Sequence, residues 1–548
     1  ESPALPETIQ AAIESRLDRL ADGPRRLLET AAILGREVSL RVLRRLWSGE
    51  GSVEKHLEEL TRLEFLTPKR GEDGTWLFKH ALIQEAAYER LVASDRKTLH
   101  GVAGRSFENF YAGRLEEAYD RLAYHYSKSG ERDRAVHYLA RFADKAARGY
   151  ALAEAVTALE EASDLFERGP GTNPGPLPDL VLRRARYLTF LGRPSEAHEL
   201  LAGERTLFET SPSVATRAQY YLALAAAQRF LGDLGPAAEN AQRALVEATP
   251  LGDGGAMGKV HIELSMQSLW LGDSIAGREH ARKAVEHFGR VGDPRRQGMG
   301  YWIEGVHEYL LGSFEKALAL EEKASMIGRA VDDPRLQSYA ATVTGLVWAS
   351  RGDWQRGLEH CGRSLSRSPD PINTACCLAF ASQAEREKGD LEKSVEDLER
   401  ATALMTDHHL LPMKGWATAW LAEALFETGR HADARQLAEE SLEICLRVGP
   451  PFAAGIAQRV RGRVALIEGR PADGRALFER SLSIFESLRS EFEAGRTGIE
   501  LARLSRSEGD SSAAAHYLTR ALERFEVAGA PAYSERASAL AEHLGTRS

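Results

Sequence analysis

The chain has 548 residues, of which 28% are charged and 7% aromatic, and its formal net charge at pH 7 is −9. So small a charge for this length excludes a general nucleic-acid footprint, and because no apolar run reaches about 18 residues the sequence predicts no membrane span. Its four cysteines show no metal-ligand spacing, which favours a reducing, cytoplasmic setting.

The chain begins at Glu1 rather than Met, so we expect it to be a fragment of a longer protein. Its first predicted domain is residues 1–110, where four helices precede two short apolar strands that flank a glycine-rich turn. Helices followed by a hairpin predict a small winged-helix-type module. The helices are expected at 8–21, 24–34, 39–47 and 52–63, the strands at 65–67 and 76–78, and the turn at 71–74.

A DNA-reading role for this module has to be weighed against its charge. Residues 1–110 carry 17 Lys and Arg against 18 Asp and Glu. A DNA-binding domain is expected to be clearly basic on balance, so nucleic acid is an unlikely partner.

The second predicted segment, residues 111–179, combines irregular helical pairs with a linker. Helices fit residues 133–148 and 151–167. Residues 168–179 hold four prolines and three glycines, a composition that cannot continue a helix.

Nine regularly spaced glycines organise the remainder, residues 180–548. Seven of the eight steps between them are 40 residues and one is 37, and a fixed period of this size is the signature of a solenoid. The residues seven before and five after each glycine are always small, as the close approach of two helices requires. The sequence therefore predicts an all-α solenoid of helix–turn–helix repeats with a capping helix near 531–544. The glycines are Gly192, Gly232, Gly272, Gly312, Gly352, Gly389, Gly429, Gly469 and Gly509.

The repeat resembles the tetratricopeptide repeat (TPR). The family's pattern of small residues around a turn glycine is met at matching offsets, and Tyr221, Leu224 and Ala225 come nearest to its opening motif. The departure is the length of 40 residues, where the family has about 34. The resemblance implies a right-handed superhelix whose concave groove binds a protein or peptide ligand.

The front of the chain resembles the region just after the ATPase core of bacterial STAND-type signalling ATPases. The motifs that carry this resemblance are residues 16–20, 27–36 and 78–88, followed by Arg96 and His100. Such regulators couple a nucleotide switch to a helical-repeat sensor and are often fused to nucleotide cyclases, Ser/Thr kinases or transcription-factor domains. The resemblance implies that ATP or ADP and Mg bind only in an upstream domain.

His80 is the single residue to which this resemblance assigns a role. In related switch ATPases a histidine of a similar motif touches the phosphate of the bound nucleotide, and Phe78-Lys79-His80 looks like that motif, although Ala81 replaces its acid. The alternative is a histidine that only caps the junction between hairpin and helix.

No catalytic or metal site is predicted in the chain itself. The nearest match to a phosphate loop, residues 253–260, lacks the first glycine and the Ser/Thr. His408 and His409 have no carboxylate or Cys partner at ligand spacing. We therefore expect no enzyme activity and no bound cofactor.

The concave groove is the predicted binding site. The offsets that face this groove in TPR proteins place aromatic residues in the early repeats and arginines in the late ones, and both residue types dominate binding hot spots. An arginine row suits an acidic ligand. The alternatives are aromatics packed between repeats and arginines on a solvated face. The predicted groove residues are Phe190, Arg229, Phe230, Trp270, Trp302, Tyr309, Arg386, Arg459, Arg463, Arg496, Arg503 and Arg506.

Together these patterns predict the sensor and regulatory arm of a STAND-type ATPase, with a protein or peptide ligand in its groove. A constitutive interaction scaffold is the first alternative. The ligand-sensing part of a transcription regulator is the second.

Overall fold

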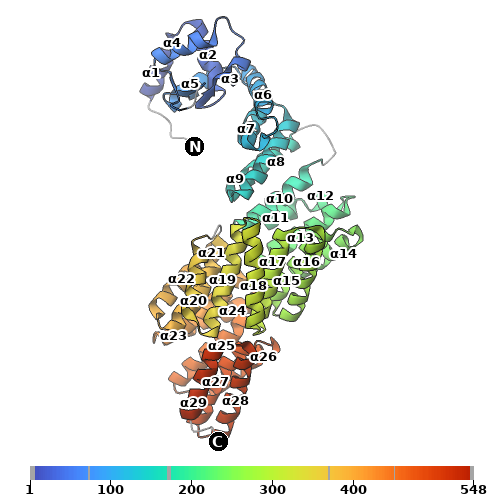
Figure 1. The fold of residues 1–548 in the computed structure, drawn as a ribbon, viewed down its shortest axis with the longest axis vertical. Coiled ribbons are helices and arrows are strands. Elements are labelled where there is room, and N and C mark those ends of the chain that lie inside the picture. The colour runs from blue at the N-terminus through green and yellow to red at the C-terminus, as the bar shows by residue number, and fades with distance from the viewer. Residues whose placement is uncertain (1–6, 72–73, 169–174, 368–370, 450, 544–548) are drawn as a thin grey trace. The chain divides into compact units, whose positions relative to one another are not determined.

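The structure, a computed structural model, is almost entirely helical (Figure 1) and describes residues 7–71, 74–168, 175–367, 371–449 and 451–543. The chain divides into two compact units, Glu1–Arg184 and Ala185–Ser548. Among the described residues, no helix is both long and apolar enough to cross a bilayer.

The first unit combines helices with a small antiparallel sheet in which β3 lies between β1 and β2. Glu37 pairs with Leu77, and Leu66 pairs with Phe78. The elements are α1 (Glu7–Asp18), α2 (Asp22–Ala32), β1 (Glu37–Ser39), α3 (Leu40–Leu46), α4 (Val53–Arg62), β2 (Leu66–Pro68), β3 (Thr75–Phe78), α5 (Ala81–Glu89), α6 (Ala93–Phe110), the 3₁₀ helix Leu115–Ala118, α7 (Tyr119–Ser129), α8 (Arg132–Arg148) and α9 (Leu152–Glu167).

The core of this module follows the amphipathic pattern of its helices. In α4, Val53, Leu57 and Leu60 are buried, as the helical period requires, and they pack in one cluster with Leu27 and Phe78. The four expected helices and the hairpin are present, although Glu72 and Asp73 of the expected turn lie outside the described residues. A winged-helix role for this module stays a prediction.

Three features of the first 190 residues differ from the sequence prediction. Strand β1 was missed because three residues are too short to show an alternating pattern. The 18-residue helix α6 was also missed. Helix α10 (Leu177–Phe190) begins inside the predicted linker, which is possible because proline is tolerated in the first turn of a helix. Residues 169–174 of that linker lie outside the described part.

The second unit is a solenoid of antiparallel helix pairs, which confirms the predicted all-α repeat fold. Its helices are α11 (Pro194–Gly203), α12 (Arg205–Glu209), α13 (Val214–Leu231), α14 (Leu234–Ala248), the 3₁₀ helix Thr249–Leu251, α15 (Gly254–Leu271), α16 (Ser274–Val291), α17 (Pro294–Leu310), α18 (Phe314–Ala330), α19 (Pro334–Arg351), α20 (Trp354–Leu365), α21 (Pro371–Lys388), α22 (Leu391–Asp407), α23 (Leu411–Glu427), α24 (His431–Val448), α25 (Pro451–Ile467), α26 (Pro471–Ser487), α27 (Glu491–Ser507), α28 (Ser511–Ala528) and α29 (Pro531–His543).

The turn glycines and the small residues have the roles that the sequence predicted. Gly232 follows α13 with φ of +85°, a left-handed conformation that favours glycine. Within a repeat, a Cβ on Gly345 would lie only 2.9 Å from the carbonyl oxygen of Gly357. The two helices of that pair therefore touch backbone to backbone. Residues 253–260 form the turn into α15, where Asp253 accepts a hydrogen bond from the Gly255 N–H.

The superhelix winds far enough for its late repeats to pack against its early ones. Turn glycines of five early repeats lie against side chains that follow more than four repeats later in the chain. One continuous apolar cluster accordingly runs from Leu234 to Ala537. The pairs in contact are Gly192 with His408, Gly232 with Val448, Gly272 with Leu488, Gly312 with Ala528, and Gly352 with Ala532.

Candidate functional site: the inner face of the superhelix

The first helices of four successive repeats carry charged side chains toward the inner face. We call these eight residues the inner ionic cluster. All are buried or half-buried, because the late repeats cover the face that the early ones present. The members are Arg386 and Glu387 on α21, Glu423 and Glu427 on α23, Arg459 and Arg463 on α25, and Glu493 and Arg496 on α27.

Glu423 is the centre of the inner ionic cluster. Its Oε1 accepts hydrogen bonds from Arg459 and Arg496, both at 3.1 Å, and Arg386 lies 3.6 Å from its Oε2. Burial by itself would raise the pKa of this carboxyl, but the guanidiniums of Arg496, Arg386 and Arg459 hold the pKa well below 4.5. Glu423 therefore stays ionised through the neutral and mildly acidic range.

Arg459 links three helices through this carboxylate. Its side chain is only 2% exposed and lies 2.7 Å from Glu493 and 3.1 Å from Glu423. It also donates to the hydroxyl of Thr497 at 3.2 Å. A guanidinium can be buried only when such partners compensate for its lost hydration, so Arg459 depends on the acids of α23 and α27.

The capping helix α29 completes the cluster from the end of the chain. Arg536 donates to Oε2 of Glu387 at 2.7 Å, although the two residues are 149 positions apart. Burial would raise the pKa of Glu387, but Arg386, Arg496 and Arg536 lower it to about 2. This contact joins the last helix to the middle of the solenoid.

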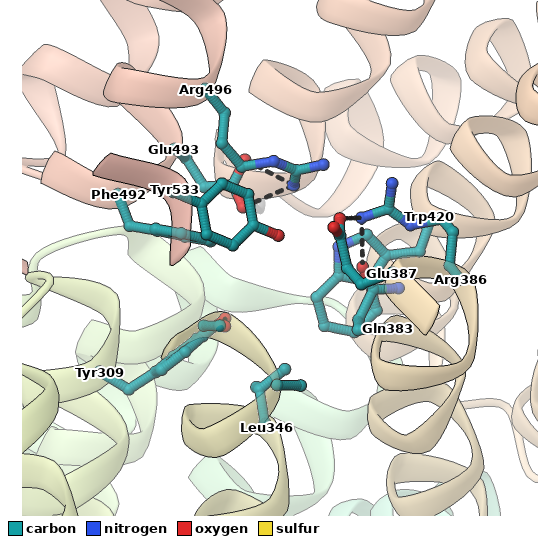
Figure 2. A pocket seen from close by; sticks show the side chains of 12 residues that line it. Tyr309, Leu346, Gln383, Arg386, Glu387, Trp420, Phe492, Glu493, Arg496 and Tyr533 are labelled. Atoms are coloured by element: carbon teal, nitrogen blue, oxygen red, sulfur yellow. Dashed lines mark hydrogen bonds and ion pairs between the residues drawn. The ribbon is translucent and has the colours of Figure 1, made fainter. Parts of the chain in front are cut away.

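A narrow cavity lies where early and late repeats meet (Figure 2). Tyr309 and Leu346 line it from the early repeats, and Phe492, Arg496 and Tyr533 line it from the late ones. Its free volume is about 10 Å³, the room that about one water molecule needs. A peptide can enter here only if the two sets of repeats move apart.

The aromatic groove residues mostly pack between repeats. Trp270 is 5% exposed and meets Trp416 edge to face, with ring centroids 6.4 Å apart. The hydroxyl of Tyr309 is 3.2 Å from that of Ser350. Trp302 and Phe230 are half-buried against the apolar cluster. The packing alternative therefore describes these side chains in this conformation.

The first two repeats carry their own buried charge contacts. Nε of Arg229 donates to Glu263 at 2.9 Å, and its guanidinium lies 4.4 Å from the ring of Phe230. The guanidinium of Arg335, which belongs to a later repeat, lies 4.4 Å from the ring of Phe190. These contacts occupy the surfaces that the sequence assigned to a ligand.

The expected row of unpaired arginines needs correction. Arg386 and Arg459 are buried, Arg496 is nearly so, and carboxylates of the chain itself neutralise all three. Arg463 lies 3.4 Å from both Glu427 and Glu500. The physical reason is that glutamates occupy the same inward offsets as the arginines, one repeat away. Ligand binding by these residues stays a prediction.

Three predicted site residues remain accessible. Arg503 is 54% exposed and 3.5 Å from Glu500, and Arg506 is exposed beside Ser511. His80 is exposed at the N-cap of α5 and makes no side-chain capping bond there. Its place fits either role that the sequence allowed, and a contact with nucleotide stays a prediction.

Sequence reasoning missed the acidic half of the cluster. Glu427 and Glu493 did not stand out because single glutamates on a helix are ordinary. Arg536 did not stand out because its partner is remote in sequence. One signal was available: Glu387 and Glu423 occupy groove-facing offsets of their repeats, as the arginines do.

Comparison with known proteins supports the fold. Residues 416–487 match the family model of the tetratricopeptide repeat. The chain is 29% identical over 103 residues to the photosystem I assembly protein Ycf3 of Acaryochloris marina, a match that covers 18% of this chain and 56% of the relative. The chain thus spans about half the length of the curated relatives that it matches.

Solved structures extend this likeness. A Rap protein complexed with competence and sporulation factor is similar over 64% of this chain and 98% of that chain, at 13% identity and a TM-score of 0.51. A STAND protein with a tetratricopeptide repeat sensor from Pyrococcus horikoshii matches 89% of this chain and 68% of its own, at 15% identity and a TM-score of 0.42. The chain therefore has the fold of a tetratricopeptide-type solenoid.

Proposed function

We propose that this chain is the ligand-sensing arm of a STAND-type signalling ATPase and that it binds an acidic peptide or protein segment on the inner face of its superhelix. The front motifs at residues 16–36 and 78–88 support the link to such an ATPase. In this proposal, ATP or ADP and Mg bind upstream, in the cytoplasm. That a Rap protein of similar fold is complexed with a factor supports ligand binding by a solenoid of this type.

The inner ionic cluster is the observation that carries the proposal. Burying ion pairs is expensive, and apolar residues of similar volume often hold a structure equally well or better. A permanent closure would thus be served by more apolar packing of the kind found at Trp270 and Trp416. Ionic closure is exchangeable, because the carboxylates of a ligand can take the places of Glu387 and Glu493.

Ligand binding would then shift the superhelix between two states. In the closed state, Arg386, Arg459 and Arg496 are paired within the chain. In an open state, they pair with the ligand, and α27–α29 separate from α17–α21. A ligand shifts such an equilibrium only by its preference for the open state. Acidic side chains supply this preference because their partners are occupied when the solenoid is closed.

A reversible cross-link tests whether opening is needed. A Cβ on Gly312 would lie 3.5 Å from Cβ of Ala528, which suits a disulfide. Peptides that bind the reduced G312C/A528C protein are selected from a random library, and their affinities are measured again after oxidation. We expect peptides rich in Asp and Glu that bind the oxidised protein at least about tenfold more weakly.

Wild type treated with the same oxidant is the control, because its own cysteines must not account for the loss. Equal affinity of the oxidised and reduced forms would contradict entry by opening. Selected peptides without acidic residues would contradict the proposed ligand chemistry. The link to an ATPase is tested separately, since the gene upstream of this segment must encode a phosphate loop of the type G-x-x-x-x-G-K-[ST].

A further inference from the structure

A second cavity lies away from the inner ionic cluster, in a cleft between α18 and α20 whose floor is one face of α19. Its volume is about 310 Å³, which is within the range of small-molecule sites. The floor is formed by Gln337, Ala341, Thr344 and Trp348, which follow one another at helical spacing. Leu318 adds an apolar side chain from α18.

Three arginines line this cleft without a carboxylate partner. Arg329 donates to the hydroxyl of Ser325 at 2.9 Å, Arg363 to the carbonyl of Glu359 at 3.4 Å, and Arg367 to the side-chain oxygen of Gln337 at 3.1 Å. Within the described ranges none of the three forms an ion pair, in contrast to the arginines of the inner face. Burial, together with Arg363 and Arg356, lowers the pKa of His360 to about 4. The cleft therefore carries an uncompensated positive potential, which suits a carboxylate.

An acidic pair stands on the wall formed by α18. Glu321 is fully buried, and neither of its carboxyl oxygens has a hydrogen-bond partner among the described residues, which costs free energy. The adjacent Glu322 is exposed in the same cleft. Packing does not account for Glu321, because the corresponding positions of other repeats are apolar: Ala281, Cys361, Leu398 and Leu518.

The repeat places acid and base at one level of the cleft. With a period of 40 residues, Arg363 has the position on α20 that Lys323 has on α18, directly after Glu322. Trp348 and Leu318 lie toward the opposite end, near the start of α20 and of α18. Positive, negative and apolar surfaces thus meet within one small cavity.

We propose that this cleft binds a free α-amino acid with a large apolar side chain. The carboxylate is held by Arg363 with Arg329 and Arg367, and the ammonium group is held by Glu321 and Glu322. The side chain lies over Ala341 and against Trp348. Only a ligand that carries both charges next to an apolar group satisfies all three surfaces, and the cleft is large enough for phenylalanine or tryptophan.

Isothermal titration calorimetry with matched probes tests the ligand class. L-phenylalanine, L-tryptophan, L-leucine and L-methionine are titrated into the purified chain, with 3-phenylpropionate and 2-phenylethylamine as analogues that lack the ammonium or the carboxylate. We expect at least one amino acid to bind below 1 mM, and each analogue at least about tenfold more weakly, because a lost charge-assisted hydrogen bond costs about that factor or more. Failure of all four amino acids to bind would overturn the proposal.

Two variants and one control locate the binding. Arg363→Gln removes the carboxylate partner and is expected to weaken binding at least about tenfold. Ala341→Phe fills the cleft and is expected to abolish binding. Arg400 has the same position one repeat later and is exposed on α22, so Arg400→Gln should bind like wild type. Circular dichroism and thermal unfolding verify that each variant is folded.

The outcome for the acid side has its own readout. Burial raises the pKa of Glu321 well above its ordinary value, so an incoming ammonium group should release a proton, and the apparent binding enthalpy should vary with the ionisation enthalpy of the buffer. Unchanged affinity in both Arg363→Gln and Ala341→Phe would overturn the site. Binding of 3-phenylpropionate as tight as that of phenylalanine would show a plain anion site and overturn the amino-acid assignment.

Discussion

At the scale of single residues, burial decides which charges matter. The inner ionic cluster and the surface of α27 carry the same residue types, yet Arg459 is 2% exposed and Arg503 is 54% exposed. An exposed ion pair contributes little because water screens it. A buried one is expensive to break because the remaining partner is left without compensation.

We therefore expect Arg459→Met and Arg503→Met to differ sharply. Arg459→Met leaves Glu423 and Glu493 buried with one partner fewer and should lower the free energy of unfolding by about 3–5 kcal/mol. Arg503→Met removes a surface pair and should change it by about 0.5 kcal/mol or less. Denaturant unfolding of both variants provides the comparison, and equal losses would mean that the cluster is not closed in solution.

Glu385 predicts a dependence of stability on pH. It is 7% exposed with Oε2 unpartnered, and burial together with Asp397 raises its pKa to about 7. The unfolded chain loses this proton near pH 4.5, so between about pH 4.5 and 7 the folded state holds a proton that the unfolded state lacks. Stability from this group consequently falls as the pH rises through that window.

The variant Glu385→Gln removes this penalty. Its melting temperature relative to wild type should be higher at pH 8 than at pH 5, because only at pH 8 does wild type carry the full cost of the buried charge. Glu399→Gln, an exposed change on the neighbouring helix α22, should show no such difference. A Glu385→Gln effect that is the same at both pH values would rule out titration of this residue in the folded state.

At the scale of elements, each repeat is held together where its two helices touch. A Cβ on Gly345 would lie 2.5 Å from Sγ of Cys361 and 2.9 Å from the carbonyl of Gly357. Gly362, on the next turn of α20, has nothing within 4 Å of the same point. The two glycines therefore separate the effect of helix–helix contact from the effect of helix propensity.

Replacement by leucine should have opposite effects at these two positions. Gly345→Leu pushes α19 and α20 apart and should cost about 1–3 kcal/mol or more, with hydrogen exchange first accelerated in this repeat and its neighbours. Gly362→Leu should stabilise the protein by up to about 1 kcal/mol, because leucine favours a helix over glycine. Unchanged exchange in α19–α21 of the Gly345 variant would argue against this helix contact.

The sequence sufficed to predict these elements but not their return contacts. Helix pairs, turns and capping helix follow from local signals such as the 40-residue period and the small residues around Gly345 and Gly357. The meeting of Arg536 with Glu387 depends instead on a small rotation per repeat, summed along the solenoid, which no local pattern records. For that reason the arginines could be placed on the inner face, whereas their burial could not be predicted.

At the scale of the whole solenoid, two glycines with the same backbone report whether the superhelix is closed. Gly232 and Gly429 both end a first helix with φ of +85°. A Cβ on Gly232 would overlap the side chain of Val448, which belongs to a late repeat, whereas nothing lies within 4 Å of the same point at Gly429. The two positions carry the same backbone strain and differ only in the contact between early and late repeats.

Alanine at both positions isolates the free energy of that contact. Gly429→Ala should cost only the strain of a left-handed alanine, about 1–2 kcal/mol. Gly232→Ala should cost this strain and a further 1–3 kcal/mol or so from overpacking against Val448. The measurement is the free energy of unfolding of each variant, with hydrogen exchange followed in α24. If the contact opens when a ligand binds, saturating ligand should reduce the difference between the two variants, because the open state no longer holds Val448 against the turn. Equal costs in the ligand-free protein would mean that early and late repeats do not touch there in solution, and the inner ionic cluster would then be accessible without any opening step.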